Sequence, residues 1–180
     1  MRVLLAFGTK YGSTEKVAIR MAEVMRSKGS EVVVMDLRQR RKVDLSEYDM
    51  VVLGSGIIVG SWTKEAKKFI EDHKKDLVRK KVALFVCCGN MLVDPSKESE
   101  YRKLYLEDIA SKAGIDGPVP MGLFGGEIDF SKYSFLTKAV LSGVGAKKVW
   151  EEKGISLDRP YDFRDWPAIE RWASSLVEGD

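Results

Sequence analysis

Short uninterrupted runs of apolar residues, rich in β-branched side chains, recur along the chain. They are Val3–Phe7, Glu31–Met35, Met50–Leu53, Val82–Cys88 and Val119–Phe124. Runs in which apolar and polar residues do not alternate are typical of strands that are buried on both faces, as in a parallel sheet. The pattern therefore predicts five parallel strands.

The segments between these runs carry apolar residues at helical spacing. The spacing predicts helices over Thr14–Lys28, after Thr63, over Ser99–Lys112 and after Asp165. Thr63 and Asp165 are suitable N-cap residues, and glycine follows two of the predicted C-termini, at Gly29 and Gly114. Strands that alternate with helices are typical of a doubly wound α/β sheet with helices on both faces.

About forty residues separate the fifth predicted strand from the last helix. They contain a further helical pattern over Ser131–Val144. We interpret residues 127–164 as an insertion in the α/β scheme. The chain of 180 residues is then predicted to be a single domain, residues 1–180.

Composition and charge exclude several classes of protein. With 44% hydrophobic and 32% charged residues the chain is typical of a globular protein, and it holds no apolar run long enough to cross a membrane. The N-terminal apolar run is too short for a signal peptide, so we expect a cytoplasmic location. A net charge of +3 is too small to indicate nucleic-acid binding. The basic cluster Arg38–Lys42 is expected in a solvated loop, and an acidic partner or anionic surface is the alternative.

The cysteines and the single histidine predict no catalytic or metal site. Cys87 and Cys88 are adjacent, which suits neither a disulfide nor a CxxC redox pair or zinc site. We interpret them as small core residues at the end of a strand. His73 lies among charged residues and is expected at the surface.

The strongest chemical signal is the first loop, which follows the first strand and opens a helix. It comprises Thr9, Lys10, Tyr11, Gly12, Ser13 and Thr14. A phosphate dianion needs several N–H and O–H donors on one side, and a helix N-terminus adds free N–H groups and a favourable dipole. The loop lacks the GK[ST] ending of a Walker loop and the GxGxxG of a dinucleotide fold. It therefore predicts a phosphate site, with a polar helix-capping turn as the alternative.

Two further loops follow the third and fourth strands. The second loop is Gly54–Trp62, and its candidate ligand-binding residues are Ser55, Gly56, Ile57, Ile58, Val59, Gly60 and Trp62. Its glycines allow a flat ring to approach the backbone, and its apolar side chains are suited to covering that ring. The third loop, Cys88–Leu92, offers Cys88, Gly89, Asn90 and Met91, whose polar groups suit the edge of a pyrimidine-like ring.

These residues resemble the flavodoxin family, whose phosphate loop reads [ST]-x-[ST]-G-x-T. In this chain Tyr11 stands at the middle hydroxyl position. Gly54–Ile57 with Gly60, Phe124–Gly126, the inserted helix after Tyr133, and Asp165–Trp166 resemble the branch of flavodoxin-like, quinone-linked protoporphyrinogen oxidases and their relatives.

The resemblance implies a flavodoxin-like, doubly wound, five-stranded parallel sheet of order 2-1-3-4-5, with a helical insertion after strand five. It implies FMN as the cofactor, with its phosphate held by Thr9–Thr14 and its isoalloxazine between the second and third loops. In the family, a backbone carbonyl of the second loop meets the flavin N5, and Gly56 or Gly60 would permit that here.

The function implied is that of an electron carrier or FMN-dependent oxidoreductase with a redox partner protein or a small-molecule electron acceptor. A protoporphyrinogen oxidase using a quinone or other acceptor is one alternative. Ile58–Val59 and Glu127–Asp129 weigh against it, because the oxidases are more basic at these stretches. Two further alternatives are a non-redox binding module of the same fold and an NADPH-dependent flavin reductase. Peripheral membrane contact through the inserted helix and the oligomeric state stay open.

Overall fold

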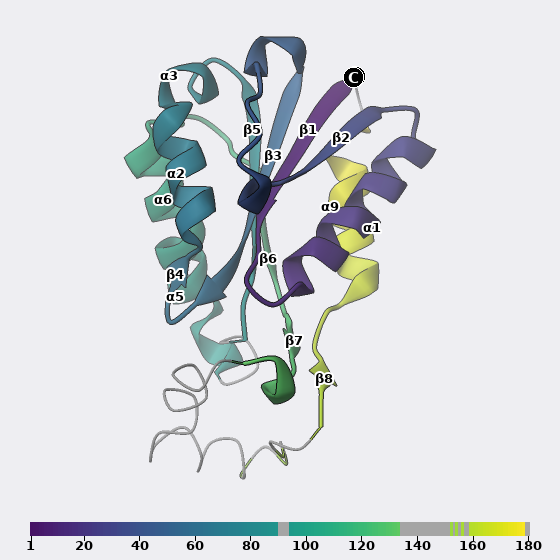
Figure 1. The fold of residues 1–180 in the computed structure, drawn as a ribbon, viewed down its shortest axis with the longest axis vertical. Coiled ribbons are helices and arrows are strands. Elements are labelled where there is room, and N and C mark those ends of the chain that lie inside the picture. Colours follow the sequence, from purple (N-terminus) through teal and green to yellow (C-terminus); the bar gives the residue numbers. More distant parts are fainter. Residues whose placement is uncertain (90–93, 134–151, 153, 155, 157–158, 179–180) are drawn as a thin grey trace.

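A parallel sheet forms the centre of the molecule (Figure 1). The computed structural model describes residues 1–89, 94–133, 152, 154, 156 and 159–178. The strands β1 to β3 are Arg2–Gly8, Glu31–Asp36 and Met50–Ile58, and the next two in the sheet are β5, Lys81–Cys87, and β6, Met121–Phe124. Their order is β2-β1-β3-β5-β6, with every neighbouring pair parallel. This confirms the predicted order, because β5 and β6 are the fourth and fifth predicted strands.

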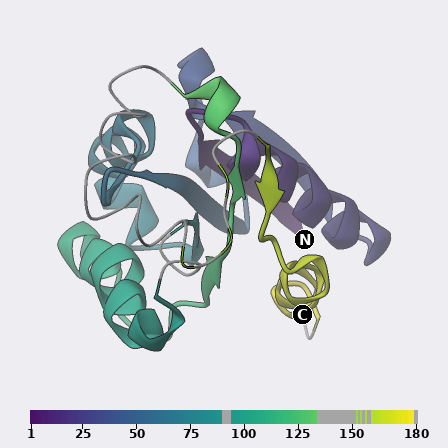
Figure 2. The same cartoon turned by 90° about the horizontal axis from the view of Figure 1, so that it is seen from below.

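Helices cover both faces of this sheet (Figures 1 and 2). On one face lie α1, Ser13–Ser27, and α9, Trp166–Ser175; on the other lie α2, Lys64–Asp72, α3, Lys74–Leu77, α5, Glu98–Arg102, and α6, Asp108–Ala113. The side chains of β1 alternate between the two cores: Val3 and Leu5 belong to the α1 side, and Leu4 to the α2 side. Because both faces are buried, the strands have the continuous apolar sequences that predicted them.

The predicted helix signals act as expected. The Thr63 hydroxyl accepts a hydrogen bond from the Ala66 N–H at 3.3 Å, and the Asp165 carboxylate accepts one from the Ala168 N–H at 2.9 Å. The helix predicted over Ser99–Lys112 is instead α5, a π-helical segment Lys103–Glu107 and α6, which ends at Gly114. Short 3₁₀ turns occur at Leu37–Gln39, Leu45–Glu47, Pro95–Lys97 and Phe130–Lys132.

The two ends of the predicted insertion lie side by side. β7, Glu127–Ile128, pairs antiparallel with β8, Tyr161–Asp162, beyond the carboxyl end of β6 (Figure 1). The helical stretch predicted over Ser131–Val144 lies, from residue 134 onward, outside the described residues. Within the described part of the chain, no helix combines the length and the apolar character needed to cross a membrane.

Candidate functional site

The first loop joins the carboxyl end of β1 to the N-terminus of α1. Gly12 is the N-cap of α1 and has a left-handed backbone with φ 88°, which glycine adopts without steric cost. Since glycine has no side chain, no side-chain group of the N-cap residue accepts a hydrogen bond from the first-turn amides, and only its carbonyl accepts one, from the Lys16 N–H at 3.3 Å. An anion with several acceptor oxygens fits a helix N-terminus of this kind.

Two hydroxyls of this loop accept hydrogen bonds from backbone amides and retain an O–H group that can donate. The Thr9 hydroxyl accepts a hydrogen bond from the Gly12 N–H at 3.0 Å, and the Ser13 hydroxyl accepts one from the Glu127 N–H at 2.9 Å. Thr9 and Thr14 are buried. A hydroxyl that accepts through a lone pair retains its O–H for a second partner, so both bonds are compatible with donation to a phosphate oxygen.

The aromatic residue of the first loop contacts the insertion. The Tyr11 ring centroid lies 4.5 Å from that of Tyr133, and the Lys10 ammonium lies 5.2 Å from the Tyr11 ring. Burial raises the pKa of the Tyr133 phenol to about 12, so this ring is neutral in the working pH range. Tyr11 therefore links the first loop to the segment that follows β7.

The second loop begins later than the sequence predicted. Gly54, Ser55 and Gly56 continue β3, paired with Phe85, Val86 and Cys87 of β5, instead of leaving the sheet after Leu53. The reason is packing: a Cβ at Gly54 would lie 2.0 Å from the Phe85 ring, and the buried Ser55 hydroxyl accepts a hydrogen bond from the Thr63 N–H at 2.9 Å. These small residues make room for neighbours within the sheet.

What remains of the second loop is a tight hairpin, Ile57–Trp62. Ile57 pairs with Trp62, and Ile58 pairs with Ser61 of the short strand β4, Ser61–Trp62. Val59 and Gly60 form the turn, and both have positive φ, 48° and 72°. Two successive positive φ angles are typical of a type I′ turn, in which a β-branched residue is strained.

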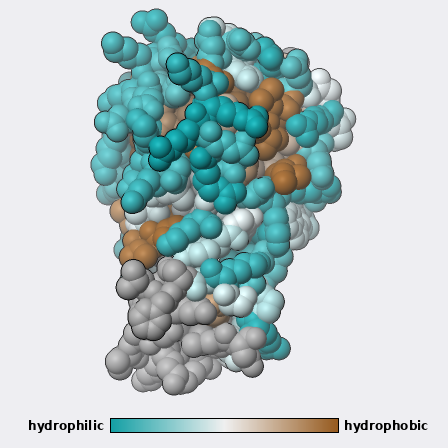
Figure 3. Space-filling view, viewed as in Figure 1, coloured by the Kyte–Doolittle hydropathy of each residue, from teal (hydrophilic) through white to brown (hydrophobic). Residues whose placement is uncertain are grey.

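Strain and exposure coincide at this turn. Val59 is 71% exposed, although valine is apolar and disfavours a left-handed backbone. The face of the molecule seen in Figure 3 is mostly hydrophilic, and its apolar surface forms separate patches. Strained backbone conformations of this kind cluster at active sites and ligand-binding segments.

The ends of β1 and β3, from which the two loops leave, are closely packed at the edge of the sheet. A Cβ at Gly56 would lie 3.0 Å from the Thr14 hydroxyl, and a Cβ at Gly8 would lie 2.0 Å from the Thr63 hydroxyl. The carboxyl ends of β1 and β3 are neighbours in the sheet and mark its topological switch point. The first and second loops therefore begin side by side, as expected from the strand order, and a ligand site shared by them stays a prediction.

Trp62 belongs to the core beneath this hairpin. Its side chain is buried, and the indole N–H donates to the Tyr105 carbonyl at 2.7 Å. Of the four second-loop side chains predicted to cover a flat ring, Ile57 and Ile58 are half-buried and Val59 is exposed. Trp62 thus supports the hairpin from below in this structure and presents no ring at the surface.

The third loop is described only at its start. The buried Cys88 donates its N–H to the Phe124 carbonyl at 2.9 Å, and a Cβ at Gly89 would lie 3.3 Å from the Ile128 side chain. Asn90 and Met91, predicted to bind the edge of the ring, lie outside the described residues. Burial raises the pKa of the Cys87 thiol to about 12, which keeps it in the unreactive thiol form.

An ionic cluster beside the first loop was not predicted. The Glu127 carboxylate lies 2.7 Å from the Lys16 ammonium, 2.9 Å from that of Lys132 and 3.3 Å from the Arg164 guanidinium. Hydrogen bonds from Lys16 hold the pKa of Glu127 below its ordinary value, and Lys132 adds to this effect against the opposing effect of burial. Residues from α1, β7 and the segment after β8 meet here, so no local sequence pattern signals the cluster.

Arg164 has spare hydrogen-bonding capacity in this cluster. Its side chain is 5% exposed and lies 4.6 Å from the Trp166 ring, and it pairs with Asp162 at 2.6 Å. Its Nη1 is buried without a hydrogen-bond partner among the described residues. A buried donor without a partner costs about 1–3 kcal/mol, so this N–H group is suited to an additional acceptor.

Comparison with known proteins agrees with this geometry. A family model described as a flavodoxin domain matches residues 4–151. A short-chain flavodoxin associated with a non-canonical PDU bacterial microcompartment has a TM-score of 0.59 at 16% identity, covering 99% of this chain and 97% of its own. Oxidised flavodoxin 1 from Bacillus cereus has a TM-score of 0.53 at 17% identity, and the match covers 86% of this chain and 95% of that flavodoxin.

A curated relative matches over a shorter range. Protoporphyrinogen IX dehydrogenase [quinone] from Escherichia coli strain K12 is 26% identical over 73 residues, which are 41% of this chain and 40% of that protein. The match thus spans less than half of the relative.

Proposed function

This chain belongs to the flavodoxin domain family, and from that premise we propose that it binds FMN and transfers electrons through it. The observation that carries the proposal is the first loop. It combines a helix N-terminus capped by Gly12, buried hydroxyls at Thr9 and Thr14, and a position at the switch point between β1 and β3.

The phosphate of FMN is held by the first loop. The amides at the start of α1 donate to its oxygens, and the hydroxyls of Thr9, Ser13 and Thr14 add further donors. Thr9 and Ser13 are already oriented by the bonds they accept from Gly12 and Glu127, so little side-chain freedom is lost on binding. The loop is thus preorganised for a dianion.

The isoalloxazine lies between the hairpin and the third loop. Gly56 gives the backbone close access to the first loop, and the turn at Val59–Gly60 presents peptide groups at the tip of the hairpin. When bound, FMN supplies the redox chemistry, while the chain positions the ring and sets its electrostatic surroundings. Lys10 and Tyr11 flank the phosphate end of the site.

The exposed hairpin favours an electron carrier over an enzyme with an enclosed substrate pocket. An electron carrier needs one edge of its cofactor within reach of another molecule, and Val59 places an apolar, exposed side chain at that edge. A redox partner protein or a small-molecule acceptor meets the flavin there. The members of the family transfer electrons to partner proteins, which supports a partner protein as the acceptor.

Quinone-linked protoporphyrinogen oxidation is the second candidate, favoured by the 73-residue match to the Escherichia coli dehydrogenase. It predicts oxidation of protoporphyrinogen IX by the FMN-loaded protein, dependent on an added quinone. An electron carrier shows no such activity and instead passes electrons to a carrier-dependent reductase or oxidase. The single domain over 1–180 and the cytoplasmic location stay predictions.

The proposal is tested by the absorption spectrum of the purified protein, followed by release and identification of the chromophore. We expect a yellow protein with one FMN per chain. A protein that stays colourless and takes up no added FMN after refolding would contradict the proposal. Stepwise reduction by single electrons would favour a carrier, whereas reduction only by an electron pair together with a substrate would favour an enzyme.

A further inference from the structure

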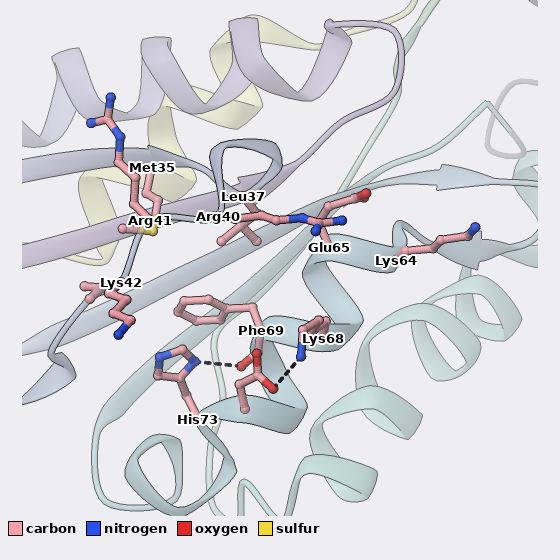
Figure 4. A pocket seen from close by; sticks show the side chains of 12 residues that line it. Met35, Leu37, Arg40, Arg41, Lys42, Lys64, Glu65, Lys68, Phe69 and His73 are labelled. Carbon is pink, nitrogen blue, oxygen red and sulfur yellow. Dashed lines mark hydrogen bonds and ion pairs between the residues drawn. The ribbon is translucent and has the colours of Figure 1, made fainter.

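A cavity lies away from the three loops, between α2 and the segment that follows β2 (Figure 4). It has a volume of about 620 Å³. Pockets that bind small molecules usually have about 300–1,000 Å³, so its size suits an organic ligand. Its residues come from Met35–Val43 on one side and from one face of α2 with His73 on the other.

The floor of this pocket is apolar and aromatic. Met35, Leu37 and Phe69 line it and are largely buried in the core. The His73 ring stacks on the Phe69 ring, with centroids 4.4 Å apart and an angle of 27° between the planes. One nitrogen of His73 is hydrogen-bonded to the Phe69 carbonyl at 3.0 Å, so the two rings form a fixed wall (Figure 4). A flat apolar group fits such a surface.

The rim of the pocket is basic and incompletely neutralised. Arg40, Lys42 and Lys64 line it, and within the described ranges none of them forms an ion pair. Lys68 is paired with Asp72 at 2.9 Å, and this hydrogen bond raises the pKa of Lys68, whereas the nearby charge of Arg40 acts in the opposite direction. The lining holds five Lys and Arg side chains against the two carboxylates Glu65 and Asp72, and this excess of positive charge favours an anion.

The conformation of Arg40 adds to this observation. Its backbone is left-handed, with φ 48° and ψ 35°, at a position where glycine or asparagine would be less strained. Figure 4 shows its side chain extending from the loop toward Glu65 and Lys64 on α2, whereas Arg41 points away from the pocket. The loop thus carries a strained arginine whose guanidinium reaches the rim.

We propose that this pocket binds a nucleotide-sized organic anion, with its ring against the Phe69–His73 wall and its phosphate groups at Arg40, Lys42 and Lys64. An inorganic anion would use the rim and leave the apolar floor uncovered. An acidic peptide would likewise gain little binding energy from the Phe69–His73 wall, because its carboxylates carry no flat ring. The site is separate from the FMN loops, because it uses the α2 surface and the segment after β2.

The test uses the only histidine in the chain as a reporter. The protein is first saturated with FMN so that the first loop is occupied, and ADP is added while the His73 ring signals are followed by NMR. We expect a saturable shift of these signals. Inorganic pyrophosphate, which has the charge without the ring, should bind at least tenfold more weakly.

Two substitutions and a matched control complete the experiment. Arg40→Gly suits the left-handed backbone and Lys42→Gln is exposed, so the double variant should fold and bind ADP at least tenfold more weakly. Lys75→Gln makes the same charge change as Lys42→Gln alone, but outside the pocket, and should bind ADP like the parent. No His73 shift at millimolar ADP, equal binding of pyrophosphate, unchanged binding by the double variant, or tighter binding of a polyglutamate peptide would each overturn the proposal. The test does not depend on the FMN proposal, since it applies equally to protein that carries no FMN.

Discussion

The first loop and the hairpin leave neighbouring strands at the same edge of the sheet, but they are built differently. In the first loop the residue with positive φ is Gly12, and the hydroxyls of Thr9 and Ser13 are hydrogen-bonded to backbone amides. In the hairpin a valine takes the left-handed position and is 71% exposed. The first loop is therefore unstrained and fixed by hydrogen bonds, whereas the hairpin turn is strained and exposed to solvent.

This difference indicates a division of work. In the proposed site the first loop holds the FMN phosphate, which keeps its charge during electron transfer, so this loop benefits from rigidity. In the same proposal the hairpin lies beside the ring, whose charge and protonation change on reduction, so a strained backbone that can rearrange suits this segment. We therefore expect substitutions in the first loop to lower stability and FMN affinity, and relief of strain in the hairpin to raise stability.

The largest effect is expected where β1 enters the first loop. Gly8→Ala places a Cβ 2.0 Å from the Thr63 hydroxyl and 3.1 Å from the Ala66 side chain. Overpacking of this kind costs about 1–3 kcal/mol, and the melting temperature should fall by several degrees. Gly126→Ala is the control, because its Cβ would meet the Ser13 hydroxyl at an ordinary 3.6 Å. Equal melting temperatures for the two variants would contradict the close approach of β1 to α2.

The next effect concerns the hydroxyl that secures the first loop. Thr9→Val keeps the shape of a buried side chain and removes the acceptor of the Gly12 N–H, which should cost about 1–3 kcal/mol in the free energy of unfolding. FMN should also bind at least tenfold more weakly. Thr9→Ser restores the acceptor and should recover most of both losses, as measured by denaturant unfolding and FMN titration. If Thr9→Ser lost as much stability and FMN affinity as Thr9→Val, the effect would come from packing and not from the hydroxyl.

A smaller effect of opposite sign is expected in the hairpin. Val59→Gly relieves the left-handed strain and should stabilise the protein by about 1 kcal/mol or less, because glycine also gains entropy in the unfolded chain. Gly12→Ala, which introduces a Cβ at φ 88°, should destabilise it by about 1 kcal/mol. Val59→Thr keeps a β-branched residue and serves as the control. If Val59→Gly lowered the unfolding free energy, the strain at this turn would be refuted.

The smallest effect is a pH dependence of the unfolding free energy that arises from Glu127. Because Lys16 and Lys132 lower its pKa in the folded protein, the stabilisation is present above the ordinary value of 4.5 and is lost as pH falls through the lowered pKa. Since both lysines are about half exposed, we expect less than about 1 kcal/mol. Unfolding of the parent and Glu127→Gln should differ at pH 7 and converge in acid. A difference that persisted below pH 3 would exclude this linkage.

Much of this fold could be predicted because its signals are local. The apolar runs predicted the strands of the parallel sheet, and Thr63 and Asp165 predicted the starts of two helices. The prediction was wrong for the length of β3: Gly54 and Gly56 suggest a loop by composition, but they serve close packing against Phe85 and Thr14.

The parts that could not be predicted depend on tertiary contacts. Glu127, Lys16 and Arg164 are far apart in sequence and meet only when the insertion closes through β7 and β8. The basic cluster after β2 was expected in a solvated loop, and only the placement of α2 makes it one wall of a pocket. The strain at Val59 depends on a two-residue turn that the sequence Val-Gly does not favour.

The most direct test of the account compares FMN with riboflavin on the same FMN-free protein, by quenching of flavin fluorescence. Riboflavin lacks the phosphate, and two charge-assisted hydrogen bonds from the first loop at about 1.5 kcal/mol each correspond to about a hundredfold difference in affinity. We expect FMN to bind in a one-to-one ratio and riboflavin about a hundredfold more weakly. Equal affinities for the two flavins, or no binding of FMN, would contradict the assignment of Thr9–Thr14 as the phosphate site.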